Sequence, residues 1–180
     1  MSATVRPEIR PARLDEVAAL AQLKLATYRE TFVEEFAIPY PERDVAAFTA
    51  DAYGEARVRA ELQDPARETW VAPGEAGDLL GYVHIGPCRL PHPEARSGDG
   101  EIHQLYVRRT AQRLGTGRRL FSLALERLGQ RYPGPVWLGV WSGNARAQAI
   151  YQARGFKLVG DYQFAVGDWR DEEYIMRLDR

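Results

Sequence analysis

Residues 101–156 switch twice between strand-like and helix-like patterns, and no other feature limits the fold as strongly. The segment 101–107 is typical of a strand, and the segment 135–141 is short and largely apolar, as a buried strand is. The segments 117–132 and 144–156 carry apolar residues at helical spacing. A strand, a helix and a second strand in this order predict a right-handed crossover, and therefore at least one pair of parallel strands.

The remaining segments predict antiparallel strands and further helices around this centre. Helix signals mark three segments, 12–32, 41–53 and 55–62. Strand and turn signals mark five others, 4–10, 68–73, 79–86, 157–166 and 172–178. With 45% hydrophobic content, the 180 residues predict one domain, 1–180, of the α/β class (mixed α+β). We expect a central mixed, mostly antiparallel sheet of about six or seven strands, flanked by about four or five helices.

The total charge and the cysteine and histidine content exclude several classes of function. The formal net charge is −1, so nucleic acid is not expected as the main partner. The N-terminus lacks the apolar segment of a signal peptide, and no stretch approaches the roughly 20 apolar residues of a membrane span. A cytoplasmic protein without a membrane partner is therefore predicted. One cysteine, Cys88, and three dispersed histidines predict no disulfide and no bound metal.

Charge is unevenly distributed along the chain. Residues 25–55 contain seven carboxylates and two arginines, whereas residues 105–120 contain five arginines and no acid. Two oppositely charged regions indicate ligands of opposite charge, although ordinary solvated helix faces remain the alternative.

The run QRLGTGRR, residues 112–119, joins a predicted strand to a predicted helix. A helix N-terminus presents unpaired N–H groups and a positive dipole end to phosphate oxygens, and Gly115 and Gly117 let the backbone approach a ligand. Arg118 and Arg119 stand where a Walker loop needs Lys and Ser or Thr, and Leu120 stands where a dinucleotide fingerprint needs glycine. A more general anion cradle is therefore predicted, with a plain strand-to-helix turn as the alternative.

Two runs carry a family resemblance. LYVRRTAQRLGTGRRL, residues 105–120, resembles the Q/R-x-x-G-x-G/A acetyl-CoA signature of the GCN5-related N-acetyltransferase (GNAT) superfamily. VWLGVWSGNARAQAIYQARGF, residues 136–156, resembles the next strand and helix of that family, with Asn144 at the helix start and Tyr151 seven residues later. The tail at 164–178 is similar to the bacterial polyamine N-acetyltransferase branch. The resemblance implies a single-domain GNAT fold, acetyl transfer to a primary amine by direct attack in a ternary complex, and a possible homodimer.

The resemblance also implies where acetyl-CoA binds. Backbone amides of the 112–118 loop are expected to wrap the pyrophosphate, and the strand at 105–107 to bind the pantetheine arm. Arginine side chains at 113, 118 and 109 supply compensating charge, since guanidinium can meet phosphate in a bidentate way. The expected acetyl-CoA contacts are Leu105, Tyr106, Val107, Gln112, Arg113, Leu114, Gly115, Thr116, Gly117, Arg118, Asn144 and Tyr151.

The reaction needs a base and an acid, because a primary amine with a pKa of about 10.4 is mostly protonated at pH 7. Glu101 is the first candidate base, since the family often places a carboxylate there that works through a water. His103 is the alternative; it shares the face of Glu101 if the strand is regular, and a bulge could change that face. His84 is a weaker third candidate. Tyr151 takes the place of the family tyrosine that protonates the departing thiolate, and a phenol is a donor at neutral pH.

The acidic region places the expected acceptor site. In this family such helices lie near the acceptor entrance, which implies a small, cationic, polyamine-like amine contacted by Tyr28, Phe32, Glu34 and Glu35. Acetylation of protein N-termini or lysines, a non-catalytic acyl-CoA-binding sensor, and a structural or interaction protein remain alternatives. The role of the proline-rich loop at 87–100 is left open, although loops of this length are usually functional or mobile.

Overall fold

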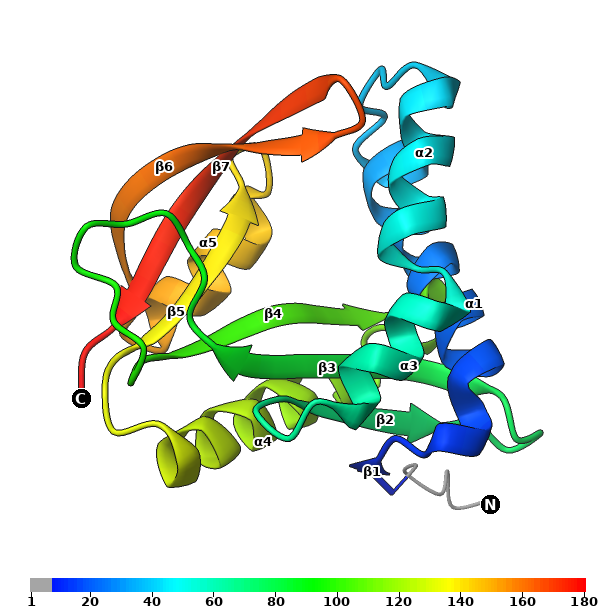
Figure 1. Ribbon diagram of the computed structural model, residues 1–180, viewed down its shortest axis with the longest axis horizontal. Helices are drawn as coiled ribbons and strands as arrows, with labels where there is room; N and C mark the ends of the chain where they lie inside the picture. The colour runs from blue at the N-terminus through cyan, green and yellow to red at the C-terminus, as the bar shows by residue number, and fades with distance from the viewer. Residues whose placement is uncertain (1–7) are drawn as a thin grey trace.

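A computed structural model describes residues 8–180, which form one continuous seven-stranded sheet in the order β1-β2-β3-β4-β5-β7-β6 (Figure 1). The strands are β1 (Arg10–Pro11), β2 (Glu68–Pro73), β3 (Leu79–Pro87), β4 (Gly100–Val107), β5 (Val136–Trp141), β6 (Lys157–Val166) and β7 (Trp169–Leu178). The helices are η1 (Leu14–Glu16), α1 (Val17–Tyr28), η2 (Arg29–Glu35), α2 (Glu42–Ala52), α3 (Glu55–Gln63), η3 (Arg109–Ala111), α4 (Thr116–Arg131) and α5 (Ala145–Ala153). This architecture confirms the predicted α/β class.

The strand pairing confirms a mixed, mostly antiparallel sheet. Only β4 and β5 pair in parallel among the described strands, and α4 makes the predicted crossover between them. The first strand differs from the prediction: residues 4–7 lie outside the described part of the chain, and the strand that forms is Arg10–Pro11.

The prediction of one regular helix over residues 12–32 is wrong, because the segment is not regular and it ends later. It consists of the 3₁₀ turn η1, the α-helix α1 and a π-helical segment, η2, that continues to Glu35. The Phe36 N–H bonds the Thr31 carbonyl at 3.0 Å, five residues back, so the helix widens. Such widened turns are frequent at functional sites.

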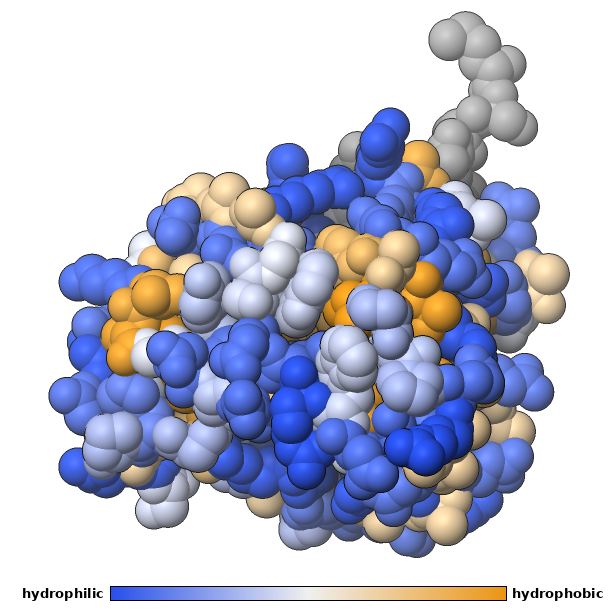
Figure 2. Space-filling view, turned by 90° about the horizontal axis from the view of Figure 1, so that it is seen from above, coloured by the Kyte–Doolittle hydropathy of each residue, from blue (hydrophilic) through white to orange (hydrophobic). Residues whose placement is uncertain are grey.

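Apolar side chains separate cleanly onto the two faces of the sheet. On β3, Val83 packs with residues of α4, whereas its neighbour Tyr82 packs with α1 on the other face. Figure 1 shows α4 along one side of β2, β3 and β4 and α3 on the other side, with α1 and α2 on the side of the molecule away from α5. The surface seen from above that view is mainly hydrophilic, with hydrophobic residues in separate small patches (Figure 2). This face therefore offers no broad apolar area of the kind that marks a large interface.

The loop at 87–100 packs against the sheet. Leu90 lies in a buried cluster with Trp137 of β5 and Ile175 of β7. The indole N–H of Trp137 donates to Asp99 Oδ2 at 2.8 Å, and His92 Nε2 lies 3.2 Å from the Val159 carbonyl oxygen. The loop therefore covers the face of β5 and β7 that carries Trp137, on the side away from α4.

Two irregularities create room in the middle of the sheet. Strands β4 and β5 pair only from Gly100 to Ile102 on β4, and beyond that point they diverge (Figure 1). On β4 the register to β3 shifts so that His103 has no partner, which is a β-bulge. Because α4 and α5 both begin beside the gap, their N-termini point at it.

Candidate active site

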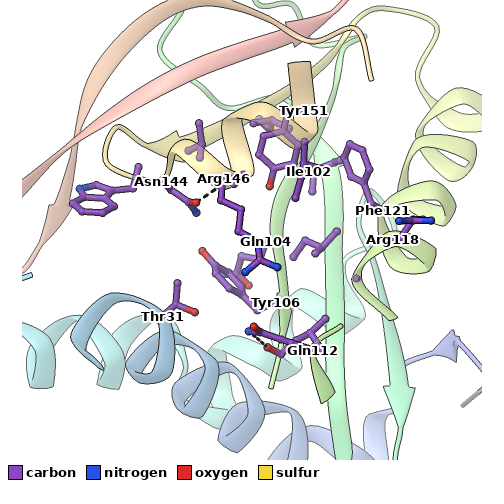
Figure 3. A pocket seen from close by; sticks show the side chains of 18 of the residues that line it. Thr31, Ile102, Gln104, Tyr106, Gln112, Arg118, Phe121, Asn144, Arg146 and Tyr151 are labelled. Carbon is purple, nitrogen blue, oxygen red and sulfur yellow. Dashed lines mark hydrogen bonds between the residues drawn. The ribbon is translucent and has the colours of Figure 1, made fainter. Parts of the chain in front are cut away.

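A cavity of about 1240 Å³ occupies the gap between β4 and β5. Its walls come from η2, β4, the loop before α4, the first turn of α4, β5, α5 and one residue of β7. Figure 3 shows side chains from these separate elements converging on one space. Five arginines line it, Arg113, Arg118, Arg119, Arg146 and Arg154. The carboxylates among its described lining residues are Glu35 and Glu173.

Most residues expected to contact acetyl-CoA meet in this cavity. Thr116 is the exception, because its side chain is buried at the start of α4. The others line the cavity: Leu105, Tyr106, Val107, Gln112, Arg113, Leu114, Gly115, Gly117, Arg118, Asn144 and Tyr151. Sequence reasoning missed Arg146, whose side chain extends from α5 into the cavity (Figure 3).

The loop before α4 has the backbone of an anion cradle. Gly115 is the N-cap of α4 with a φ of 83°, and no side chain caps the helix there. A Cβ built on Gly115 meets nothing within 4 Å, so the space above it is open. Gln112 Nε2 donates to the Val107 carbonyl at 3.2 Å, which ties the loop to the end of β4. The first N–H groups of α4 therefore have no helical acceptor and face the cavity.

The predicted acceptor residues divide into two pairs. Phe32 and Glu35 line the cavity. Tyr28 does not; it is buried in an aromatic cluster beneath η2. Glu34 does not either, since its carboxylate pairs with Arg109 at 3.2 Å. That pairing also holds Arg109 at η2, where it bonds the Glu30 carbonyl at 2.8 Å, away from the cavity walls.

Glu101 and His103 contact each other on β4, and of the two only His103, which lies at the bulge, lines the cavity. His103 Nδ1 is 3.1 Å from Glu101 Oε1, and the two side chains are 5% and 9% exposed. The Arg89 backbone N–H donates to Glu101 Oε2 at 2.7 Å. Burial would raise the pKa of Glu101, but hydrogen bonds and charge from His103 and Arg89 outweigh it and lower the pKa. The Glu101 carboxylate is thus occupied and does not line the cavity.

The weaker base candidate, His84, and the single cysteine, Cys88, do not line the cavity. His84 Nδ1 lies 2.8 Å from Thr69 Oγ1, and burial lowers the pKa of its imidazole well below the ordinary value. Burial raises the pKa of the Cys88 thiol to about 12, so it is not a thiolate at neutral pH. Within residues 8–180, no three His, Cys, Asp or Glu side chains are grouped to hold a metal ion.

Tyr151 and Asn144 lie on α5 at the edge of the cavity. Asn144 Oδ1 accepts a hydrogen bond from the Ala147 N–H at 3.0 Å, so it caps the helix. The Tyr151 ring packs against Phe121 and Phe156, and its hydroxyl points into the cavity (Figure 3). Burial raises the pKa of Tyr151 to about 12, and no protein acceptor in the described chain takes its proton. The hydroxyl is therefore a free donor at neutral pH.

Glu173 is a second cavity residue that sequence reasoning missed. It lies on β7 opposite Trp141, and Tyr162 donates a hydrogen bond to its Oε2 at 2.7 Å. Burial raises its pKa to about 7. One signal was present in the sequence: strand alternation puts Glu173 on the same face as Ile175, which is an apolar and buried position.

Comparison with known proteins identifies the family. The profile described as "Acetyltransferase (GNAT) family" matches residues 25–156. The chain belongs to this family. A GNAT relative, the uncharacterized N-acetyltransferase in the pepI 3' region of Lactobacillus delbrueckii subsp. lactis, is 27% identical over 153 residues, which cover 85% of this chain and 88% of the relative. This GNAT protein is therefore an N-acetyltransferase, and acetyl-CoA is its acetyl donor.

Solved structures share the GNAT fold along the whole chain. PaiA N-acetyltransferase from Thermoplasma acidophilum, solved in complex with coenzyme A, superposes with a TM-score of 0.74 at 16% identity and full coverage of both chains. The ribosomal-protein-S18-alanine N-acetyltransferase from Escherichia coli superposes with a TM-score of 0.63 at 18% identity, covering 96% of this chain and 92% of that one. No helix in the described range is both long and apolar enough to cross a membrane.

Proposed function

We propose that this GNAT enzyme transfers acetyl from acetyl-CoA to a primary amine of a small, cationic, polyamine-like acceptor, by direct attack in a ternary complex. The observation that carries the proposal is the charge of the single cavity between β4 and β5. Four of the five arginines lie in the loop before α4 or in the first turns of α4 and α5, whereas the carboxylates of Glu35 and Glu173 come from η2 and β7. The arginine-rich part of the cavity suits a polyanionic donor, and the part with the carboxylates suits a cationic acceptor.

Acetyl-CoA is held, in this proposal, by main chain and arginine. The free N–H groups at the start of α4 and the side chains of Arg113 and Arg118 receive the pyrophosphate. Strand β4 has no β5 partner beyond Ile102, so its main-chain groups there are available to the pantetheine arm. The bound donor supplies a thioester carbonyl for attack by the amine.

The acceptor end combines aromatic rings with carboxylates. The rings of Phe36 and Trp141 lie 4.7 Å apart, and Phe32 meets Tyr106 edge-on at 6.1 Å. Ring faces beside a carboxylate attract an ammonium group by cation–π and charge interactions. Tyr151 then donates its proton to the departing thiolate. Glu101 remains a predicted base that acts through a water, and cytoplasmic location, dimer formation and the one-domain extent of 1–180 likewise remain predictions.

The test of this function measures binding and turnover in one preparation. Calorimetric titration with acetyl-CoA is expected to show binding, and a thiol-release assay is expected to show CoA release with diamines and polyamines. Amino acids, aminoglycosides and peptides complete the panel. Release with peptides alone would move the assignment to a protein acetyltransferase, and binding without release from any amine would favour a sensor.

Gly115→Val is expected to weaken acetyl-CoA binding by about tenfold. A φ of 83° costs a β-branched residue about 1–2 kcal/mol, so the loop relaxes from the conformation that binding then has to restore. Gly77→Val is the matched control: its φ is 81°, its Cβ also meets nothing within 4 Å, and it lies in the turn between β2 and β3. Calorimetry on both variants is the measurement. Equal affinity in both would remove the 112–118 loop from the binding site.

A further inference from the structure

The Glu173 side chain lines the cavity, in space that a glycine on the neighbouring strand leaves open. Its neighbour on β5, Gly139, has no side chain, and a Cβ placed there would lie 2.9 Å from both Glu173 Oε2 and the Tyr162 hydroxyl. The glycine therefore leaves the space that this carboxylate and its tyrosine fill. Glu173 Oε2 accepts the Tyr162 proton, and no protein donor in the described residues bonds Oε1. One carboxylate oxygen is thus held in place while the other is available to a ligand.

The groups that surround Glu173 are acidic or neutral. Asp171 on the same strand and Glu101 on β4 interact with its charge, and both disfavour a second negative charge nearby. The buried hydroxyls of Tyr106 and Tyr53 also feel its charge. Strand β5 contributes only the glycine and Trp141 at this level. Among residues 8–180 no cation pairs with Glu173, so a cationic ligand is the partner that its surroundings lack.

Glu101 differs from Glu173 on each of these points. Its two oxygens are taken by the Arg89 N–H and by His103, and its pKa is lowered. Glu173 lies in the cavity wall, and burial brings its pKa to about 7, the range in which a base works well at neutral pH. Of the two carboxylates, the geometry gives Glu173 the direct path to an amine in the cavity.

We propose that Glu173 is the catalytic base that takes the proton from the acceptor amine, and that Tyr162 is a positioning residue that acts through it. This inference rests on the proposed acetyl transfer. The acceptor ammonium gives one proton to Glu173, and the neutral nitrogen forms a bond to the acetyl carbonyl carbon. The carbon–sulfur bond breaks, and the sulfur takes the Tyr151 proton. The second proton lost by the nitrogen restores Tyr151 through solvent, and Glu173 releases its proton to solvent.

The proposal predicts the pH dependence of kcat/KM for total amine. A base must be deprotonated, so the wild-type rate rises with pH up to about 7 and then levels off until the acceptor itself titrates near 10. Glu173→Gln keeps a side-chain oxygen for Tyr162 but cannot take a proton. The variant must use amine that is already neutral in solution, so its rate keeps climbing about tenfold per pH unit. At pH 7.5 we expect a loss on the order of a hundredfold.

Two further variants separate proton transfer from structure. Glu172→Gln changes the adjacent carboxylate, which is exposed on the opposite face, and is expected to behave as wild type. Tyr162→Phe removes a hydrogen bond that lowers the pKa of Glu173, so the acid limb is expected to move to higher pH with the plateau retained. Far-ultraviolet circular dichroism and calorimetry with acetyl-CoA establish that each variant is folded and binds the donor.

The outcomes distinguish this inference from the reaction on which it rests. If Glu173→Gln keeps the plateau and a rate within about twofold of Glu172→Gln, Glu173 is not the base. Loss of the plateau in Glu101→Gln, with Glu173→Gln unaffected, would give the role to Glu101. If the wild-type protein releases CoA with no amine, the proposed function itself fails and this assignment falls with it.

Discussion

Replacing Tyr151 by phenylalanine is expected to lower kcat by on the order of a thousandfold while acetyl-CoA affinity stays within about twofold. The hydroxyl lies in the cavity wall, has no protein acceptor in the described chain, and is removed without changing the ring that packs on Phe121. Because burial raises its pKa to about 12, Tyr151 stays protonated through the working range. Deprotonation of Tyr151 is therefore not expected to lower kcat below about pH 10.

The measurement for Tyr151→Phe is steady-state CoA release, with calorimetry for donor binding. Tyr132→Phe is a suitable control, because its hydroxyl bonds the Ala66 carbonyl at the far end of α4 and does not line the cavity. An unchanged kcat in Tyr151→Phe would show that water protonates the thiolate. A rise in Kd with kcat unchanged would place the hydroxyl in donor binding.

Replacing Trp137 by alanine is expected to lower the free energy of unfolding by about 3–5 kcal/mol, a large part of the roughly 5–15 kcal/mol typical of a domain. The side chain is fully buried on β5 between Leu90 and Ile175, and its indole N–H donates to Asp99. The substitution therefore leaves a cavity, removes the donor from a buried carboxylate and frees the loop at 87–100.

Urea unfolding followed by circular dichroism measures this loss. Trp137→Phe fills most of the space but still lacks the N–H, so a smaller loss of about 1–3 kcal/mol is expected. Leu158→Ala, on the edge strand β6 with 52% of the residue exposed, is expected to change stability by less than about 0.5 kcal/mol. Equal losses in Trp137→Ala and Leu158→Ala would contradict the assigned core position.

The loop at 112–118 and the helix N-terminus that follows it could be predicted from the sequence, because both are local features. A strand, a short turn with Gly115 and Gly117, and a helix lie within twenty residues, and helix N-termini present free N–H groups in any fold. The cap at Asn144 and the place of Tyr151 on the same helix follow from helical spacing in the same way. These residues meet in one cavity as expected.

The acceptor end could not be predicted because it depends on packing between distant segments. The bulge at His103 and the ion pair between Glu34 and Arg109 arise from β4 meeting β3 and η2. Glu173 reaches the cavity because β7 pairs with β5, more than thirty residues earlier in the chain, and Gly139 of β5 leaves space for its carboxylate.

Local periodicity and turn chemistry thus determined the α/β class, the crossover and the loop that we propose binds acetyl-CoA, since each depends on neighbours in sequence. The tertiary structure decided which carboxylate is available, because the free energy of a charge depends on what surrounds it. Glu101 is enclosed by hydrogen-bond donors, whereas Glu173 faces the cavity, bonded by one tyrosine and paired with no cation of the described chain.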